Sequence, residues 1–185
     1  MLDKLVLRFV GTIDFNYVII SGYIAILFGR SRNTEDVDIF IDHISSHKFL
    51  EFYKKLEKQD FYILDAEDAE DAYDRLKEGL SVRFAEKNTT EPNFELKFPK
   101  RDTDFYSIEH RIRVIISNKH EVMISPIELQ IAYKLYLGSE KDELDARHLY
   151  GLFKNNINKK LLKDFMSNLK VKENYSKEVL GERID

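Results

Sequence analysis

The sequence predicts an α/β fold in which helices flank a mixed, twisted β-sheet and a helical segment follows at the C-terminus. Two observations favour it. Short apolar, β-branched runs such as Tyr17–Ser21 and Asp36–Asp42 alternate with helical segments through the first two thirds of the chain. From Ser125 onward the apolar spacing is helical throughout. We therefore expect an α/β core at residues 1–125 and a helical region at residues 126–185 packed on that core.

Each element follows from a local pattern. Helices are indicated by apolar residues at helical spacing and by capping residues, in the segments 2–13, 22–28, 45–58, 66–78, 126–137, 141–154 and 158–169. Strands are indicated by short apolar or alternating runs, in the segments 17–21, 36–42, 61–64, 80–85, 94–98, 111–117 and 121–124. The loop 88–93, which contains Pro92, separates two of these strands as a hairpin loop would. A polar segment follows residue 169.

Composition limits the classes of protein to which the chain can belong. Its 185 residues are 43% hydrophobic and 34% charged, with a formal net charge of −4. This charge gives no global positive field for nonspecific nucleic-acid binding. The absence of cysteine excludes disulfides and thiolate metal sites and favours a reducing compartment. No stretch approaches the roughly 20 apolar residues of a membrane span, and residues 1–13 lack a signal-peptide pattern. We expect a cytoplasmic protein without membrane contact.

The segment Val18–Asp42 contains the residues with the clearest chemistry. Side chains alternate between the faces of a strand, so Asp36 and Asp38 project from the same face. Two carboxylates on a rigid strand suit Mg²⁺, which shares its oxygen ligands with phosphate groups. Upstream, Ser21 and Gly22 lie where the first strand turns into a helix, and the N–H groups of a helix start favour a phosphate. A phosphate site followed by a metal site is the arrangement that phosphoryl or nucleotidyl transfer needs.

A site that holds two metal ions about 3.5–4 Å apart needs a third carboxylate from a neighbouring strand. Glu95 is the best candidate, because it alternates with Phe94 and Leu96, which would face the core. The alternative interpretation is that Glu95 is an ordinary outward-facing strand residue beside Lys97.

Arg30, Arg32 and Thr34 are further candidates in the same region. The planar guanidinium groups of the two arginines suit triphosphate oxygens. The alternative is that they pair with carbonyl groups and the negative dipole end at a helix terminus. Thr34 is expected to support the loop by hydrogen bonding.

The stretches Ser21–Tyr23 (SGY) and Gly29–Ile39 (GRSRNTEDVDI) resemble the signature of the nucleotidyltransferase (DNA polymerase β-like) superfamily. They are most similar to its small prokaryotic branch, in which a Gly-Gly-Tyr-Ala-type turn precedes an Arg-x-Thr-x-Asp-hydrophobic-Asp strand. Several toxins of toxin–antitoxin systems belong to that branch. Ser21 stands where the family's turn has its first glycine. The resemblance covers residues 18–42 and roughly 94–149, and it implies a nucleotidyltransferase-like α/β core.

The resemblance also implies roles for residues outside the first stretch. In the family an acidic residue in a later strand completes the metal site, and Glu95 matches it. The family often carries a lysine like Lys134 that reaches the nucleotide, although a lysine near an apolar helix face usually extends to solvent. The run from Gly138 to Leu149 resembles the family's Lys-Asp-x-x-Asp-x-x-x-Leu segment. Its acids, Asp142 and Asp145, also fit a solvated first helical turn, so the roles of Lys141, Asp142 and Asp145 stay open.

The leading hypothesis is Mg²⁺-dependent transfer of a nucleoside monophosphate from an NTP, such as ATP, to a hydroxyl acceptor. Asp36, Asp38 and Glu95 would be catalytic and hold two Mg²⁺ ions. The nucleotide-binding candidates are Ser21, Gly22, Arg30, Arg32, Thr34 and Lys134. The acceptor is RNA, a protein side chain or a small molecule such as an aminoglycoside. The toxin resemblance makes tRNA the first choice, with a cognate antitoxin protein as a possible partner. The alternatives are a catalytically inactive nucleotide-binding regulatory or partner-binding module and, less favoured, a phosphodiesterase.

Overall fold

The computed structural model describes residues 2–117 and 120–184, which form two compact units. The sheet unit comprises residues 2–23 and 33–124, and the helical unit comprises residues 24–32 and 125–184. The expected division at residues 125 and 126 did not include the segment 24–32 in the helical part. This division falls within helix α2 (Gly22–Leu27), which begins in the sheet unit and continues into the helical unit.

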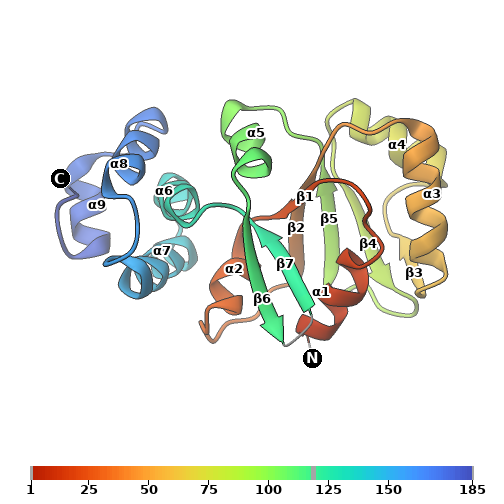
Figure 1. Cartoon of the computed structure of the whole chain (residues 1–185), viewed down its shortest axis with the longest axis horizontal. Helices are drawn as coiled ribbons and strands as arrows, with labels where there is room; N and C mark the ends of the chain where they lie inside the picture. Colours follow the sequence, from red (N-terminus) through yellow and green to blue (C-terminus); the bar gives the residue numbers. More distant parts are fainter. Residues whose placement is uncertain (1, 118–119, 185) are drawn as a thin grey trace. The chain divides into compact units, whose positions relative to one another are not determined.

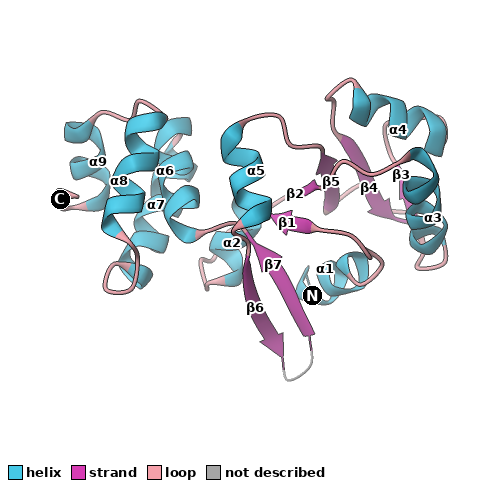
Figure 2. Cartoon of the chain, turned by 45° about the horizontal axis from the view of Figure 1, so that its top comes forward, coloured by secondary structure: helices cyan, strands magenta, loops and turns pink. Residues whose placement is uncertain are grey.

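Within the described residues, seven strands form one mixed sheet in the order β3-β4-β5-β2-β1-β7-β6 (Figures 1 and 2). The strands are β1 (Tyr17–Ile19), β2 (Asp36–Ile41), β3 (Phe61–Ile63), β4 (Val82–Glu86), β5 (Asn93–Lys97), β6 (Ile112–Ser117) and β7 (His120–Ile124). The pairs β2·β5 and β1·β7 are parallel, whereas the other neighbouring pairs are antiparallel. The α/β fold class with a mixed sheet is therefore confirmed, including the hairpin of β4 and β5.

An aromatic cluster forms the centre of the sheet unit. The helices of this unit are α1 (Leu2–Val10), α3 (Ser46–Glu57), α4 (Ala69–Lys77) and α5 (Asp102–Glu109). Phe9 of α1 is fully buried and stacks on Phe94 of β5, with ring centroids 3.9 Å apart. The ring of Phe61 meets Phe9 edge-on at 5.2 Å, and Phe52 and Phe84 complete the cluster. Edge-to-face and offset aromatic pairs of this kind add stabilisation beyond the apolar area that they bury.

Strand β2 separates the aromatic core from a polar surface. Its apolar residues Val37, Ile39 and Ile41 are fully buried, and its intervening residues are only partly buried. In the parallel register Val37 lies opposite Phe94, so the two share the core face. Asp36 and Asp38 therefore project from the opposite face of the sheet.

The helical unit packs four consecutive helices together with the segment 24–32. The helices are α6 (Ile127–Leu137), α7 (Glu140–Phe153), α8 (Lys159–Asn168) and α9 (Glu173–Leu180), and α6 packs against both α7 and α8 (Figure 1). Phe28 packs edge-on against Phe153 at 4.8 Å. The His148 ring nitrogen Nε2 lies 3.0 Å from the Phe28 carbonyl oxygen. Among the described residues, none of the helices has the length and hydrophobicity that a membrane span requires.

Two helices differ from the sequence predictions. The sequence predicts no element at residues 102–109, which form α5, and a polar segment after residue 169, which contains α9. Both are eight-residue helices with few apolar positions, so their periodicity is weak. Helix α4 begins at Ala69 rather than at residue 66, because the Asp68 side chain accepts a hydrogen bond from the Asp71 amide and caps it there.

Replacing Phe9 with alanine should lower the free energy of unfolding by about 3–5 kcal/mol, because it removes a ring that contacts four others in the core. Chemical denaturation followed by circular dichroism measures this change. Phe105→Ala is the matched control, since the Phe105 side chain is 41% exposed and its loss should cost less than about 1 kcal/mol. Equal losses in the two variants would contradict the assignment of Phe9 to the centre of the core.

Candidate active site

Three carboxylates share the polar face of the sheet unit. Asp36 and Asp38 lie two residues apart on β2, and Glu95 lies directly opposite Asp38 on the parallel neighbour β5. Neighbouring strands lie about 4.7–4.9 Å apart, so the Asp38 and Glu95 side chains are neighbours on this face. The structure thus brings together the three acidic residues that the sequence singled out.

A lysine lies between two of these carboxylates. The Lys97 ammonium group is 2.9 Å from Asp38 Oδ1 and 3.3 Å from Glu95 Oε1. Lys97 is two residues beyond Glu95 on β5, so both side chains project from the same face. Its side chain is 33% exposed and that of Asp38 is 14% exposed. Lys97 is not among the site residues predicted from the sequence, although the alternation that selects Glu95 also places Lys97 on this face.

The charges on this face shift one another's pKa values. Burial raises the pKa of Asp38, the Lys97 ammonium opposes this, and the nearby Asp36 and Glu95 carboxylates add to it. Burial also raises the pKa of Glu95, but hydrogen bonding from Ser81 and the charge of Lys97 outweigh it, so the pKa lies below the ordinary value. Burial lowers the pKa of Lys97, yet its contacts with Asp38 and Glu95 raise it overall. Lys97 is therefore a cation at neutral pH, and Glu95 is an ionised carboxylate.

The turn after β1 lies at the same end of β2 as the carboxylates. The Ile20 amide donates to the Asp38 carbonyl oxygen at 2.9 Å, so the antiparallel pairing of β1 and β2 brings Ser21 alongside the N-terminal part of β2. Ser21 has a φ of 64°, a left-handed backbone conformation that favours glycine. The serine thus keeps the conformation expected of a glycine at this turn, and Gly22 begins α2.

Thr34 hydrogen-bonds to the start of β2. Its hydroxyl donates to the Asp36 carbonyl oxygen at 2.8 Å and lies 3.4 Å from Asp36 Oδ1. These contacts hold the chain that leads into the two aspartates. The side-chain amide of Asn93 adds a second tether, since it donates to the Glu35 carbonyl oxygen at 3.1 Å.

The oxygen atoms on this face are of the chemical type that a divalent cation binds, although they are not grouped as a metal site in the described residues. Asn93 lies opposite Asp36 in the β2·β5 register, and its side-chain oxygen Oδ1 is buried with no hydrogen-bond partner in the described part of the chain. Carboxylate and amide oxygens are the ligands that Mg²⁺ takes. In residues 2–117 and 120–184, no three or more His, Cys, Asp or Glu side chains are grouped so that they could hold a metal ion. The Lys97 ammonium lies between Asp38 and Glu95 on the same face.

The helical unit contains a second charged cluster, centred on Asp145. The Asp145 side chain is fully buried, and Arg30, Arg32 and Lys134 all pair with it. Arg30 binds one carboxylate oxygen, and Arg32 reaches the other at 2.5 Å. The Lys134 ammonium, whose side chain is 3% exposed, lies 3.1 Å from the same oxygen as Arg32. The structure thus brings the three predicted nucleotide-binding cations of this unit to one carboxylate.

Asp142 extends this cluster at the start of α7. Its carboxylate accepts a hydrogen bond from Lys134 at 2.6 Å and another from the Ser139 hydroxyl at 2.5 Å. Burial raises the pKa of Asp142, but these hydrogen bonds outweigh it and hold the pKa below its ordinary value. Arg30 also donates to the Lys141 carbonyl oxygen at 3.3 Å. Within the Lys-Asp-x-x-Asp motif, Asp145 is therefore a buried ion-pair partner rather than a solvated first-turn acid.

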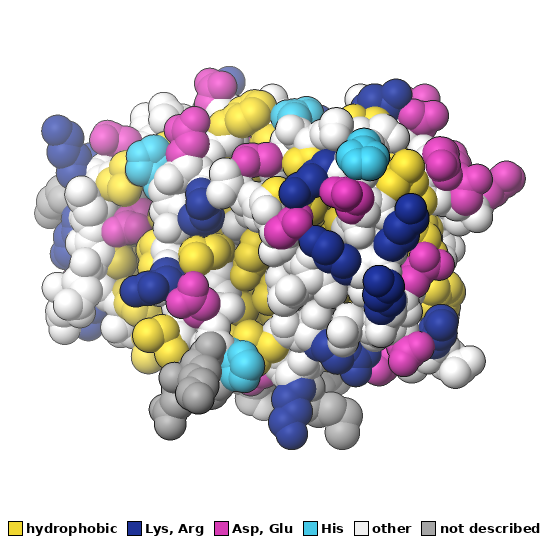
Figure 3. All heavy atoms as spheres, turned by 45° about the vertical axis from the view of Figure 1, so that its right-hand side comes forward, with side chains coloured by type: hydrophobic (Ala, Val, Ile, Leu, Met, Phe, Trp, Pro, Cys, Tyr) yellow, Lys and Arg dark blue, Asp and Glu magenta, His cyan; other side chains and the backbone are white. Residues whose placement is uncertain are grey.

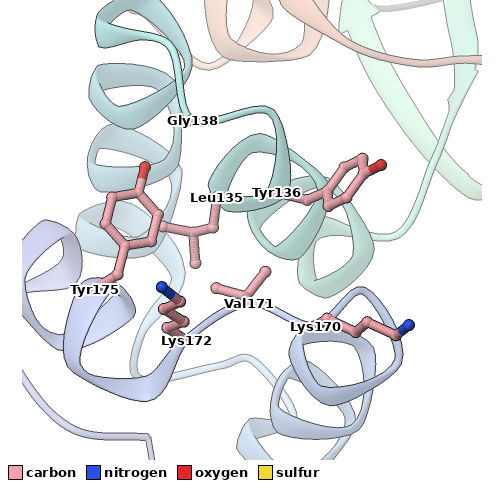
Figure 4. A pocket seen from close by; sticks show the side chains of 7 residues that line it. All are labelled: Leu135, Tyr136, Gly138, Lys170, Val171, Lys172 and Tyr175. Atoms are coloured by element: carbon pink, nitrogen blue, oxygen red, sulfur yellow. The ribbon is translucent and has the colours of Figure 1, made fainter.

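The helical unit also has a small pocket of about 260 Å³ between α6 and the segment that leads into α9 (Figure 4). Apolar side chains and two lysines line it, namely Leu135, Tyr136, Gly138, Lys170, Val171, Lys172 and Tyr175. The sequence-predicted site residues do not line it. On the face shown in Figure 3, acidic and basic side chains are intermixed, as expected for a net charge of −4.

Solved structures with the same architecture exist at low sequence identity. An antigenic nucleotidyltransferase-like protein from Paracoccidioides brasiliensis is 20% identical with a TM-score of 0.53, and the alignment covers 98% of this chain and 91% of that one. The antibiotic-resistance factor ANT(2'')-Ia in solution is 10% identical with a TM-score of 0.58, covering 90% of each chain. Its crystal structure in complex with adenylyl-2''-tobramycin is 12% identical with a TM-score of 0.55, covering 90% and 95%.

The chain has a nucleotidyltransferase fold. At these identities the likeness establishes the fold alone, and it confirms the architecture that the sequence resemblance implied. No protein-family model matches the sequence, and no curated protein sequence matches it significantly. Within this nucleotidyltransferase fold, the roles of the site residues and of the metal ions stay predictions.

Replacing Asp145 with asparagine should lower the free energy of unfolding by about 3–5 kcal/mol, because it leaves three partly or fully buried cations without their shared counter-charge. Urea denaturation followed by circular dichroism measures the change. Asp164→Asn on α8 is the control, since Asp164 is exposed in the same unit and its change should stay within about 0.5 kcal/mol. A loss no larger than that of the control would show that the cations do not depend on Asp145.

Proposed function

We propose that this protein is a nucleotidyltransferase that moves a nucleoside monophosphate from an NTP to a hydroxyl acceptor. The arrangement of Asp36, Asp38 and Glu95 on one face of two adjacent strands is the observation that carries the proposal. The fold shared with ANT(2'')-Ia, which was solved in complex with adenylyl-2''-tobramycin, supports the same reaction class. Asp36 and Asp38 would hold Mg²⁺, and Glu95 would complete the acidic set. A bound Mg²⁺ supplies charge neutralisation at the phosphates.

The chain's own groups would each have one task in this reaction. The acceptor oxygen forms a bond to the α-phosphorus, the bond between the α-phosphorus and the bridging oxygen breaks, and pyrophosphate leaves. Glu95, held ionised by Ser81 and Lys97, would accept the proton of the acceptor hydroxyl. Ser21 and Gly22 would bind phosphate oxygens at the turn, and Thr34 would fix the start of β2. Arg30, Arg32 and Lys134, which the sequence also offered for nucleotide phosphates, pair with Asp145 in the helical unit and are given no task in this reaction.

We propose three classes of acceptor, in order of preference. RNA, with tRNA first, follows from the resemblance to toxins, which would also imply a cytoplasmic antitoxin partner. A small molecule is the second class, because one neighbour in fold was solved in complex with adenylyl-2''-tobramycin. A protein side chain is the third. On the face shown in Figure 3 the acidic and basic side chains are intermixed, which favours an acceptor that needs only a small contact area there.

A nucleotide-binding module without catalysis is the second candidate function. The contact of Lys97 with both Asp38 and Glu95 favours it, because an ammonium group occupies part of the face where metal ligation is expected. This module would bind Mg²⁺·NTP without releasing pyrophosphate.

The deciding experiment incubates the purified protein with Mg²⁺ and each α-labelled NTP, together with total tRNA or tobramycin as acceptor. Pyrophosphate release with label on one acceptor would establish the transferase and identify the acceptor. Binding of an NTP without release would establish the module. Absence of NTP binding would contradict both candidates.

In this assay Asp38→Asn should lower the rate of label transfer at least about 10³-fold, because one metal-binding charge is worth several kcal/mol in the transition state. Asp74→Asn is the control, since Asp74 is exposed on α4 and pairs there with Lys77. The melting temperatures of both variants show whether they fold. A folded Asp38→Asn variant with the wild-type rate would exclude Asp38 from the reaction.

A further inference from the structure

We infer that the Lys97 ammonium takes the position of a second metal ion, so that the carboxylate face binds one divalent cation rather than two. This inference rests on the proposed function and revises the two-ion site expected from the sequence. Its basis is the place of Lys97 between Asp38 and Glu95, one on each of two adjacent strands.

The geometry puts the ammonium where a bridging cation would lie. A Mg²⁺ ion that bridges Asp38 and Glu95 needs an oxygen of each at about 2.0–2.1 Å. The Lys97 ammonium already contacts both carboxylates, at 2.9 Å and 3.3 Å. Two cations this close repel each other strongly in a partly buried site. The ammonium and a bridging metal ion therefore exclude each other.

The side chain of Lys97 is held in this place by more than one carboxylate. In the β2·β5 register Lys97 lies opposite Phe40, two residue pairs beyond Asp38 and Glu95, and its ammonium group contacts both of these carboxylates. About two thirds of the side chain is covered. The ammonium group of a lysine on an exposed edge strand would be surrounded by water. The ammonium group of Lys97 instead contacts carboxylates on two adjacent strands.

The charge count gives the same result. The three carboxylates of Asp36, Asp38 and Glu95 with the one ammonium of Lys97 have a net charge of −2, which one divalent cation neutralises. A second divalent cation would leave a net charge of +2 on a face with no further acidic partner in the β2·β5 register. Asp36 and Asn93 lie opposite each other in the register and would hold the remaining cation, because the Asn93 side-chain oxygen has no hydrogen-bond partner in the described part of the chain.

The test counts Mn²⁺ ions bound per chain by electron paramagnetic resonance, with Mn²⁺ alone as the probe. The variants are Lys97→Met, which removes the charge at similar length, and Lys97→Arg, which keeps it. Lys87→Met is the control, because Lys87 is exposed, pairs with Asp60 at 3.4 Å and lies directly after the end of β4, away from the three carboxylates. Circular dichroism melting shows that each variant is folded.

The wild type, Lys97→Arg and Lys87→Met should each bind one Mn²⁺, and Lys97→Met should bind two. Two ions on the wild type would show that the ammonium leaves when metals bind, and would overturn the inference. A single ion on folded Lys97→Met would also overturn it, because nothing would then depend on the charge of Lys97. Neither result affects the proposed transferase. Failure of the wild type to bind any Mn²⁺ would instead contradict the metal site itself, and the inference with it.

Discussion

The buried ion pairs of Asp145 are the interaction on which the arrangement of the helical unit depends most. A fully buried carboxylate is stable only when cations and hydrogen bonds compensate the loss of water. Here the compensation comes from Lys134 on α6 and from Arg30 and Arg32 in the segment after α2. The same carboxylate therefore fixes two helices and a loop that lies more than a hundred residues earlier in the chain. This explains why the segment 24–32 belongs to the helical unit.

In the sheet unit the main electrostatic feature is repulsion among carboxylates on one face, rather than the burial of a single carboxylate. Three carboxylates gather on one face because the alternation of β2 and β5 must keep Val37 and Phe94 in the core. A slip of one residue would bury Asp36 and Asp38 in the aromatic cluster, so the position of the acids follows from the packing. Lys97 then reduces the repulsion between Asp38 and Glu95. The aromatic core and the acidic face are thus two results of one register.

Much of the fold and of the acidic face could be predicted from the sequence, because strand alternation and helix capping are local patterns. Alternation located β2 and its aspartates, and the capping residue Ser45 located a helix start that the structure confirms. Helix α5 could not be predicted, since its eight residues lack a continuous apolar stripe. The pairing of Asp145 with Arg30 and Arg32 could not be predicted either. Local spacing contains no information about which distant charge will be buried beside it.

The two clusters show how a burial pattern determines what a charged group can bind. Around Asp145, three cations and two carboxylates leave an excess of positive charge on groups that are largely buried. On β2 and β5, three carboxylates and one ammonium leave an excess of negative charge on groups that are partly exposed. An uncompensated charge that is partly exposed can bind a counter-ion from solvent, whereas a buried carboxylate that loses one partner loses stability. The Asp145 cluster therefore contributes mainly to the fold. The face with Asp36 and Asp38 is the one on which a cation from solvent would bind at the smallest cost in folding stability.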